Sequence, residues 1–277
     1  MLAILILALA PGDLGYQYLL LPYSVDEAIF SRGEPRFIAP IPKTTFSGTS
    51  YVAGIKAGKA GGHVRGFYIE GIYLNSGKIE GYDTAGTYIG DFAYHAGAFS
   101  GARVFSWRGY TILLGAELLF QSAAGQSAFA GALSIGIGGS IPLMRSEVLW
   151  AFQAKHLGYE LMPFESVRSR LPAGAEAGAK WISPGKSWEL SAGLGSQMDL
   201  PVYGTLGGVW WVYGYPIGVA ASFNSKTRKL AGEGDILTGL SAGALFRLGT
   251  TRLAYSWTPQ GLLGDAHRIQ IDLGCPR

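Results

Sequence analysis

The C-terminal stretch, residues 251–273, has the clearest alternation of apolar and polar side chains in the chain. Two alternating runs flank a turn at residues 259–265, and their large apolar positions are Leu253, Tyr255, Trp257, Ile269, Ile271 and Leu273. A period of two is that of a β-strand, so the pair predicts an antiparallel hairpin. The intervening positions include Arg252, Arg268, Gln270 and Asp272. A charged face opposite an apolar face is typical of a strand between lipid and a wet interior.

Composition excludes a helical membrane protein. Charged residues make up 15% of the 277 residues, whereas about 25% is usual in soluble domains. The longest uninterrupted apolar run, residues 1–10, is well short of the roughly 20 residues that a membrane-spanning helix needs. In lipid, the remaining way to satisfy backbone groups is a closed sheet. The sequence therefore predicts an all-β fold, a transmembrane antiparallel β-barrel.

Candidate barrel strands follow one another from residue 44 onward. They are residues 44–54, 63–75, 87–105, 110–121, 127–137, 147–155, 173–182, 187–197, 202–213, 216–223, 237–248, 251–258 and 267–273. These segments are odd in number, whereas single-chain bacterial barrels normally have an even number, so we expect a further strand at residues 36–41 and about fourteen in all. Twelve is the alternative, because patterns place strand ends poorly. Residues 44–277 are thus predicted to form one barrel.

The first 43 residues lack this alternation. Residues 1–10 resemble the apolar part of a secretory signal peptide, with Ala8-Leu9-Ala10 as a cleavage site; a mis-assigned start or a retained apolar tail is the alternative. Residues 11–43 contain a predicted short helix at residues 24–30, where Ser24 and Glu27 have capping-box spacing. We expect residues 11–43 to form a plug inside the barrel or to lie at its periplasmic mouth.

Two features of the predicted strands concern the lumen and the membrane interfaces. In residues 110–121, Glu117 alternates with apolar neighbours, so we expect it to point into the lumen. The seven tryptophans lie mainly toward predicted strand ends, as aromatic girdles at both membrane interfaces require. The alternative is that aromatic residues favour any β-strand.

Three segments together resemble the PorV/PorQ family of outer-membrane proteins. Residues 73–92 contain Gly77, Ile79, Gly81 and Asp83 in the G-x-I-x-G-x-D pattern of that family's early hairpin. Residues 157–172 are similar to its mid-chain loop. The most specific match is the closing hairpin, residues 253–269, which contains Pro259, Gly264, Asp265, His267 and Arg268.

The resemblance implies a FadL-like barrel of fourteen strands in the bacterial outer membrane. Its best-known members work with the type IX secretion system, where the PorV type receives secreted cargo. Charged residues in the predicted long loops are then candidates for partner binding: Lys78, Glu80, Asp83, Asp91, Glu165, Arg168 and Arg170. The alternative for any one of them is that it keeps a loop soluble.

Other kinds of chemistry find little support in the sequence. The four histidines have no metal-binding spacing, and the single cysteine, Cys275, has no His or Cys neighbour. Asp265 and His267 with a serine would suggest a hydrolase, but a structural role in the closing hairpin is the stronger interpretation. The net charge of +3 is scattered, which argues against nucleic-acid binding. We expect no cofactor, no metal and no enzymatic activity.

Two functions of different classes remain. The first is a non-enzymatic component of protein secretion or cell-surface assembly, with outer-membrane lipid and other envelope proteins as partners. The second is a FadL-like transporter of hydrophobic small molecules, which requires an N-terminal plug and a lateral opening. Short loops favour the first, and an apolar pocket lined by the N-terminal segment would favour the second.

Overall fold

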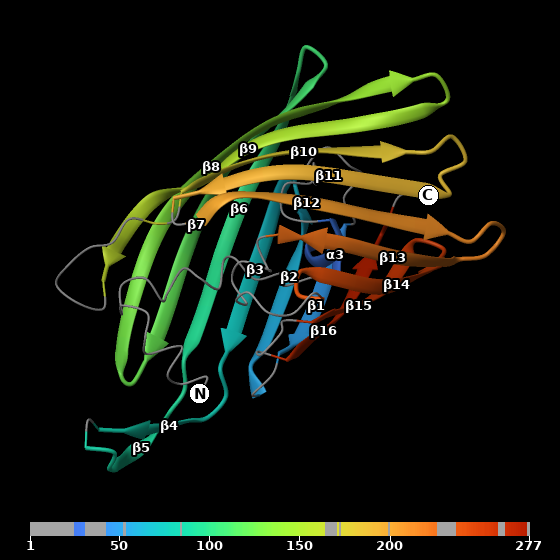
Figure 1. Ribbon diagram of the computed structural model, residues 1–277. Coiled ribbons are helices and arrows are strands. Elements are labelled where there is room, and N and C mark those ends of the chain that lie inside the picture. The colour runs from blue at the N-terminus through green and yellow to red at the C-terminus, as the bar shows by residue number, and fades with distance from the viewer. Residues whose placement is uncertain are drawn as a thin grey trace.

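The computed structural model in Figure 1 describes residues 25–30, 43–51, 54–83, 85–163, 171, 173–198, 200–225, 237–259 and 264–275. Within these residues, fourteen strands close into a barrel in the order β1-β16-β15-β14-β13-β12-β11-β10-β9-β8-β7-β6-β3-β2. Closure pairs the first strand with the last, from Thr44 opposite Leu273 to Ser50 opposite His267. The predicted antiparallel barrel of about fourteen strands is confirmed.

The barrel strands are β1 (Thr44–Ser50), β2 (Lys56–Val64), β3 (Phe67–Asn75), β6 (His95–Trp107), β7 (Tyr110–Ala123), β8 (Gln126–Leu143), β9 (Ser146–Met162), β10 (Gly174–Ile182), β11 (Trp188–Gln197), β12 (Leu200–Trp211), β13 (Ile217–Asn224), β14 (Leu240–Leu248), β15 (Thr251–Pro259) and β16 (Asp265–Leu273). A separate hairpin of β4 (Ile79–Tyr82) and β5 (Tyr88–Phe92) projects from one end of the barrel (Figure 1). The short helix α3 (Val25–Phe30) lies within the barrel. No helix in the described part of the chain is long and apolar enough to cross a membrane.

The strand that the sequence pattern missed is β2. We expected the extra strand at residues 36–41, which lie outside the described residues. The sequence of β2, KAGKAGGHV, has three glycines and no large apolar side chain before its last residue. Strand propensity comes mostly from β-branched and aromatic side chains, so this strand gives almost no local signal. It is held instead by complete ladders to β1 and β3.

Other predicted strands had wrong bounds. The predicted strand at residues 87–105 is two elements, β5 and β6. They separate where the Tyr94 backbone binds Ser76 and closes the base of the β4–β5 hairpin. Strands β8 and β9 are longer than predicted. Leu157 and Gly158, which the resemblance placed in a mid-chain loop, therefore lie within β9.

The connections differ in length at the two ends of the barrel. One end holds the start of β1, the end of β16 and short turns such as residues 65–66, 108–109, 144–145 and 249–250. The other end holds the longer connections, residues 76–94, 163–173 and 225–239. Outer-membrane barrels have short periplasmic turns and long extracellular loops. The end with the short turns is therefore periplasmic, and the β4–β5 hairpin is extracellular.

Side chains alternate between the two faces of the wall. In β16 the exposed positions include His267, Ile269 and Ile271, whereas Arg268, Gln270 and the other intervening residues are buried in the interior. Leucines at outward positions of other strands are exposed in the same way, for example Leu118, Leu133, Leu194 and Leu206. An apolar outer face around a polar inner face matches lipid outside and a wet interior. The protein is therefore a barrel of the bacterial outer membrane.

Aromatic side chains mark both ends of the outer face. Near the periplasmic turns, Trp188 stacks on Trp210 with 5.9 Å between ring centroids, and Tyr110 meets Trp150 edge-on at 6.1 Å. Near the extracellular loops, Tyr255 lies on the outer face of β15. This placement agrees with girdles at the two lipid–water interfaces.

Candidate functional site

Helix α3 occupies the lumen against strands β12 to β16 (Figure 1). Its sequence VDEAIF has Asp26 and Glu27 in the first turn, where negative charge complements the helix dipole. Val25 and Ile29 lie four residues apart, and therefore on one side of the helix. They are buried with apolar residues of the barrel wall, Val209, Ala220, Leu245 and Ala254. One side of the helix is thus packed on the wall and its first turn presents two acids.

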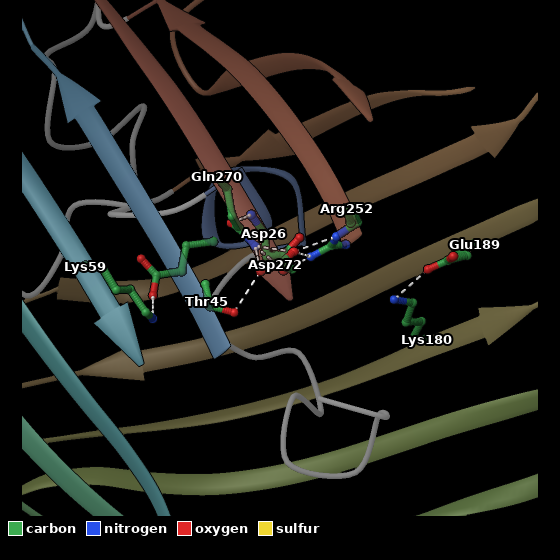
Figure 2. Close-up of polar contacts among 9 residues, drawn as sticks. Asp26, Thr45, Lys59, Lys180, Glu189, Arg252, Gln270 and Asp272 are labelled. Carbon is green, nitrogen blue, oxygen red and sulfur yellow. Dashed lines mark hydrogen bonds and ion pairs between the residues drawn. The ribbon is translucent and has the colours of Figure 1, made fainter. Parts of the chain in front are cut away.

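The first acid, Asp26, binds strands beside the closure of the barrel (Figure 2). Arg252 of β15 donates to Asp26 Oδ2 at 2.5 Å and to Asp272 Oδ2 of β16 at 2.7 Å. Gln270 donates to Asp26 and to Asp272, each at 2.9 Å. Thr45 of β1 donates to Asp272 Oδ1 at 2.7 Å. The network therefore connects α3 with β15, β16 and β1.

The second acid, Glu27, binds on the other side of the closure. Lys59 of β2 lies 2.7 Å from Glu27 Oε1 and 2.6 Å from Glu70 Oε2 of β3. The side chains of Lys59 and Glu27 are only 4% and 6% exposed. We call the residues Asp26, Glu27, Lys59, Glu70, Arg252, Gln270 and Asp272 the ionic cluster. Through α3 it joins strands on both sides of the β1–β16 closure.

Glycines allow the helix to approach the wall closely. A Cβ atom built on Gly207 of β12 would lie 2.1 Å from the Ile29 carbonyl oxygen, and one on Gly243 of β14 would lie 2.8 Å from the Ile29 side chain. Ser222 of β13 donates to the Ala28 carbonyl at 2.8 Å. The helix backbone is therefore seated directly on the barrel wall.

A second group of inward residues, near the extracellular loops, is apolar. Strands β3, β6, β7 and β8 present buried residues that pack together near the extracellular loops: Leu74, Ala96, Ala98, Leu119, Ala130 and Ala132. We call these six residues the apolar wall. Tyr51 and Leu171, from two extracellular connections, are buried in the same cluster. The extracellular end of the lumen is thus lined on this side by small aliphatic side chains.

A β-bulge places two polar side chains next to each other in the interior. The register of β8 and β9 shifts between Leu133 and Ile135, and His156 has a positive φ of 57°. Both Lys155 and His156 are consequently buried inside. Lys155 lies 2.5 Å from Glu176 of β10, which also accepts a hydrogen bond from Tyr203.

Glu117 points to the interior and binds this bulge. Its Oε2 lies 2.9 Å from His156 Nδ1, and the Glu117 side chain is 11% exposed. The sequence reasoning had singled out this glutamate but not its partner. The alternation of β9 puts His156 on the outer face, and only the bulge turns it inward.

The predicted loop residues Lys78, Glu80, Asp83 and Asp91 lie together on the β4–β5 hairpin. Lys78 Nζ is 2.7 Å from Asp91 Oδ2, and Tyr82 donates to Glu80 at 2.8 Å. The hydrogen bond from Lys78 lowers the pKa of the Asp91 carboxyl, and the same bond raises the pKa of the Lys78 ammonium. Their role in partner binding remains a prediction. Glu165, Arg168 and Arg170 lie outside the described residues.

The closing-hairpin motif is divided between the two faces of the wall. Pro259 and Asp265 form the last pair of β15 and β16, and Gly264 before them has a φ of 76°. His267 points outward, 2.8 Å from the Tyr255 hydroxyl. Arg268 points inward, donates to Thr258 at 2.8 Å and lies over the Tyr51 ring at 5.6 Å. The motif therefore provides a turn, an outer polar pair and an inner cation.

Sequence reasoning missed most of the ionic cluster. The available signal was charge at inward positions, such as Arg252 and Asp272 in alternation with apolar residues. That signal places a side chain in the lumen but does not identify its partner on α3. In the described part of the chain, no group of three or more His, Cys, Asp or Glu side chains is arranged to hold a metal ion.

A hollow of about 630 Å³ lies on the outer side of the wall and not in the lumen. Small outward residues, Ala179, Ala192, Gly208 and Ala221, form its floor, and larger ones such as Trp181 and Phe223 stand beside them. Because these side chains point outward, the hollow faces lipid.

No protein-family model and no curated protein match the sequence. Solved outer-membrane proteins resemble the structure at low identity. The Pseudomonas putida toluene transporter TodX has a TM-score of 0.47 and 7% identity over 89% of this chain and 95% of that one. The KdgM porin has a TM-score of 0.41 and 6% identity over 83% and 97%. A mutant of the Rh. blastica porin has a TM-score of 0.36 and 9% identity over 83% and 97%.

Proposed function

We propose that the protein is a transporter of hydrophobic small molecules across the outer membrane, a FadL-like function, with α3 as its plug. The observation that carries the proposal is the apolar wall at the extracellular end of the lumen. The lumen of a water-filled pore is polar. An apolar solute that leaves water for such a wall gains about 25 cal/mol for each Å² that it buries. A polar solute gains nothing there.

The ionic cluster supports the role of α3 as a plug. Asp26 and Glu27 fix the helix to β15 and β2, on opposite sides of the closure. Buried ion pairs contribute little net stability, because the cost of removing the charges from water offsets their attraction. When water enters the lumen, it can replace these contacts. The helix is therefore held in one position by ion pairs that can be exchanged for contacts with water when the helix moves.

Uptake of labelled naphthalene by intact cells that produce the protein tests the transport proposal. Ala132→Glu places a charge on the apolar wall, so we expect uptake to fall toward that of cells without the protein. Ala132→Val changes size without charge, and we expect uptake to be retained. A correctly folded Glu variant that takes up naphthalene as fast as the wild type would refute the proposal. Folding is checked by the heat-induced shift of the barrel on gels.

A second candidate is a non-enzymatic, PorV/PorQ-like role in protein secretion or surface assembly. The β4–β5 hairpin favours it. Tyr82, Tyr88 and Ile89 are 55%, 52% and 69% exposed at the extracellular end, although all three are large apolar or aromatic side chains. In the described chain the hairpin pairs with no other strand, so its two edges are open to a partner strand.

Purification from outer membranes in mild detergent distinguishes the two candidates. A secretion or surface protein that copurifies in fixed ratio with the wild type, but not with a variant whose residues 79–92 are replaced by a Gly-Ser linker, supports the assembly role. A lone barrel that carries bound apolar molecules contradicts that role and agrees with transport.

A further inference from the structure

Two matching tyrosine–histidine pairs lie on the outer face at the extracellular end. The Tyr73 hydroxyl is 2.7 Å from His95 Nδ1, and the Tyr255 hydroxyl is 2.8 Å from His267 Nδ1. In both pairs the rings are stacked, with centroids 6.0 and 6.2 Å apart. A tyrosine that donates to Nδ1 leaves the proton on Nε2, on the other side of the ring. In that tautomer each imidazole can donate from Nε2, away from its tyrosine.

The two histidines belong to one row of outward residues across the closure of the barrel. His267 pairs with Ser50, Ser50 with Lys56, Lys56 with Asn75, and Asn75 with His95. At about 4.8 Å per strand, the row is roughly 19 Å long, with Lys56 in its middle. Lys56 is exposed and makes no ion pair with any described residue. Asp265 precedes His267 on the same face of β16, one step farther from the membrane.

On the membrane side of this row, the middle of the outer surface carries no side chains. This middle part is formed by Gly48 of β1 and Gly58 of β2, and a Cβ atom built on Gly48 would meet no other atom within 4 Å. On the same register row, larger outward residues flank the glycines, Ile269 on β16 and Tyr73 on β3. Polar and cationic groups thus stand above a bare strip of two glycines that faces lipid, and Phe46 of β1 is the next outward residue on the membrane side.

We propose that this strip and row bind an anionic, phosphate-bearing lipid of the outer leaflet. Its acyl chains would lie along the glycine strip, and its phosphates would accept hydrogen bonds from Lys56 and the two imidazoles. The row lies at the lipid–water boundary, because it is where β1, β2 and β16 meet the extracellular loops. An unpaired cation at that level attracts anionic headgroups, by about 1 kcal/mol per charge, or fivefold in affinity. The proposal is independent of transport through the lumen.

Native mass spectrometry of the full-length protein in detergent tests the site, with diphosphoryl lipid A and its monophosphoryl form as probes. We expect tighter binding of the diphosphoryl lipid. Lys56→Gln should weaken that binding about fivefold, and His95→Gln with His267→Gln should weaken it further. Lys186→Gln changes an exposed cation at the periplasmic end and should leave binding unchanged. All four side chains are at the surface, so the variants are expected to fold.

Any of three results would overturn the proposal. One is equal binding by the wild type and the Lys56 and histidine variants. Another is an equal loss on Lys186→Gln, which would show attraction by net charge alone. A wild type that does not distinguish the diphosphoryl from the monophosphoryl lipid counts against phosphate recognition in the same way. Loss or retention of naphthalene uptake has no bearing on these outcomes.

Discussion

The two sides of the lumen differ in chemistry although one barrel builds both. The strands around the closure, β15, β16, β1, β2 and β3, carry the ionic cluster, which binds α3. Strands β3, β6, β7 and β8 carry the apolar wall near the extracellular loops, and β7 also carries the inward Glu117. Strand alternation therefore decides which residues face inward but not what the interior is for. One group of inward residues binds a helix by charge, and the other packs small aliphatic side chains together.

The strands that carry the ionic cluster are also shorter than most of those that carry the apolar wall. Strands β1, β2, β15 and β16 have 7 to 9 residues, whereas β6, β7 and β8 have 13 to 18. About 9–11 tilted residues suffice to cross a membrane. The short strands thus barely span the bilayer, and the long ones continue beyond it. The helix is anchored where the wall is shortest.

The largest expected effect comes from breaking the ionic cluster. Arg252→Met leaves Asp26 and Asp272 without their cation, and Asp272 is fully buried. We expect the free energy of unfolding to fall by about 3–5 kcal/mol, measured by urea unfolding in lipid vesicles. Arg145→Met, in an exposed turn, is the control and should change it little. Equal stability of the two variants would show that the cluster does not hold the structure together.

A smaller loss is expected on the apolar side. Leu119 is 2% exposed in the apolar wall, whereas its neighbour Leu118 faces lipid and is 60% exposed. Leu119→Ala should lower the free energy of unfolding by about 2–5 kcal/mol if the wall is packed. Leu118→Ala should cost less in the same urea experiment. If Leu119→Ala costs no more than Leu118→Ala, the wall is an open surface and not a packed one.

The packing of α3 against the barrel wall can be disturbed without replacing a charged residue. Gly207→Ala pushes a Cβ atom against the Ile29 carbonyl, and such overpacking costs about 1–3 kcal/mol. We expect faster hydrogen exchange at residues 25–30. Gly48→Ala, where the added atom meets nothing within 4 Å, should leave the exchange rate unchanged. Unchanged exchange in both variants would place the helix away from the wall.

The smallest expected effect is outside the lumen, at the β4–β5 hairpin. Lys78 lowers the pKa of Asp91, so their pair stabilises the hairpin above the unfolded pKa of Asp and loses this contribution as pH falls through the lowered value. The raised pKa of Lys78 gives the opposite dependence at alkaline pH. Hydrogen exchange of residues 79–92 should therefore be slowest at neutral pH, after correction for intrinsic rates. Asp91→Asn should remove the change in exchange rate at acidic pH. If that change persists in the variant, it is caused by another group.

Alternation correctly predicted which residues face the lumen and which face lipid in strands where large apolar side chains occupy one face. Residues 251–273 and Glu117 are examples, because leucine, isoleucine and aromatic residues stand between their polar neighbours. Strand β2 could not be found in this way, since Gly58, Gly61 and Gly62 leave no apolar face to detect. The number of strands was right; β2 was missed, and the strand expected at residues 36–41 lies outside the described residues.

Contacts distant in sequence set a second limit. The capping-box spacing predicted a helix at residues 24–30, and the structure has one at Val25–Phe30. Its carboxylates, however, bind Lys59 and Arg252, which are 32 and 226 residues away. No local pattern specifies such partners. The β-bulge that turns His156 toward Glu117 is a second case, because a single extra residue reverses the face.

The difference between the two sides of the lumen is tested most directly by photolabelling with an alkane that carries a diazirine, followed by peptide mapping at single-residue resolution. Inner and outer residues alternate along β8, so Ala130 and Ala132 report the lumen while Leu133 reports surrounding lipid. The proposed transport predicts label on Ala130 and Ala132 as well as on the outer face, and none on Gln270 or Asp272 in the ionic cluster. Label confined to outward residues would contradict an apolar path through the barrel.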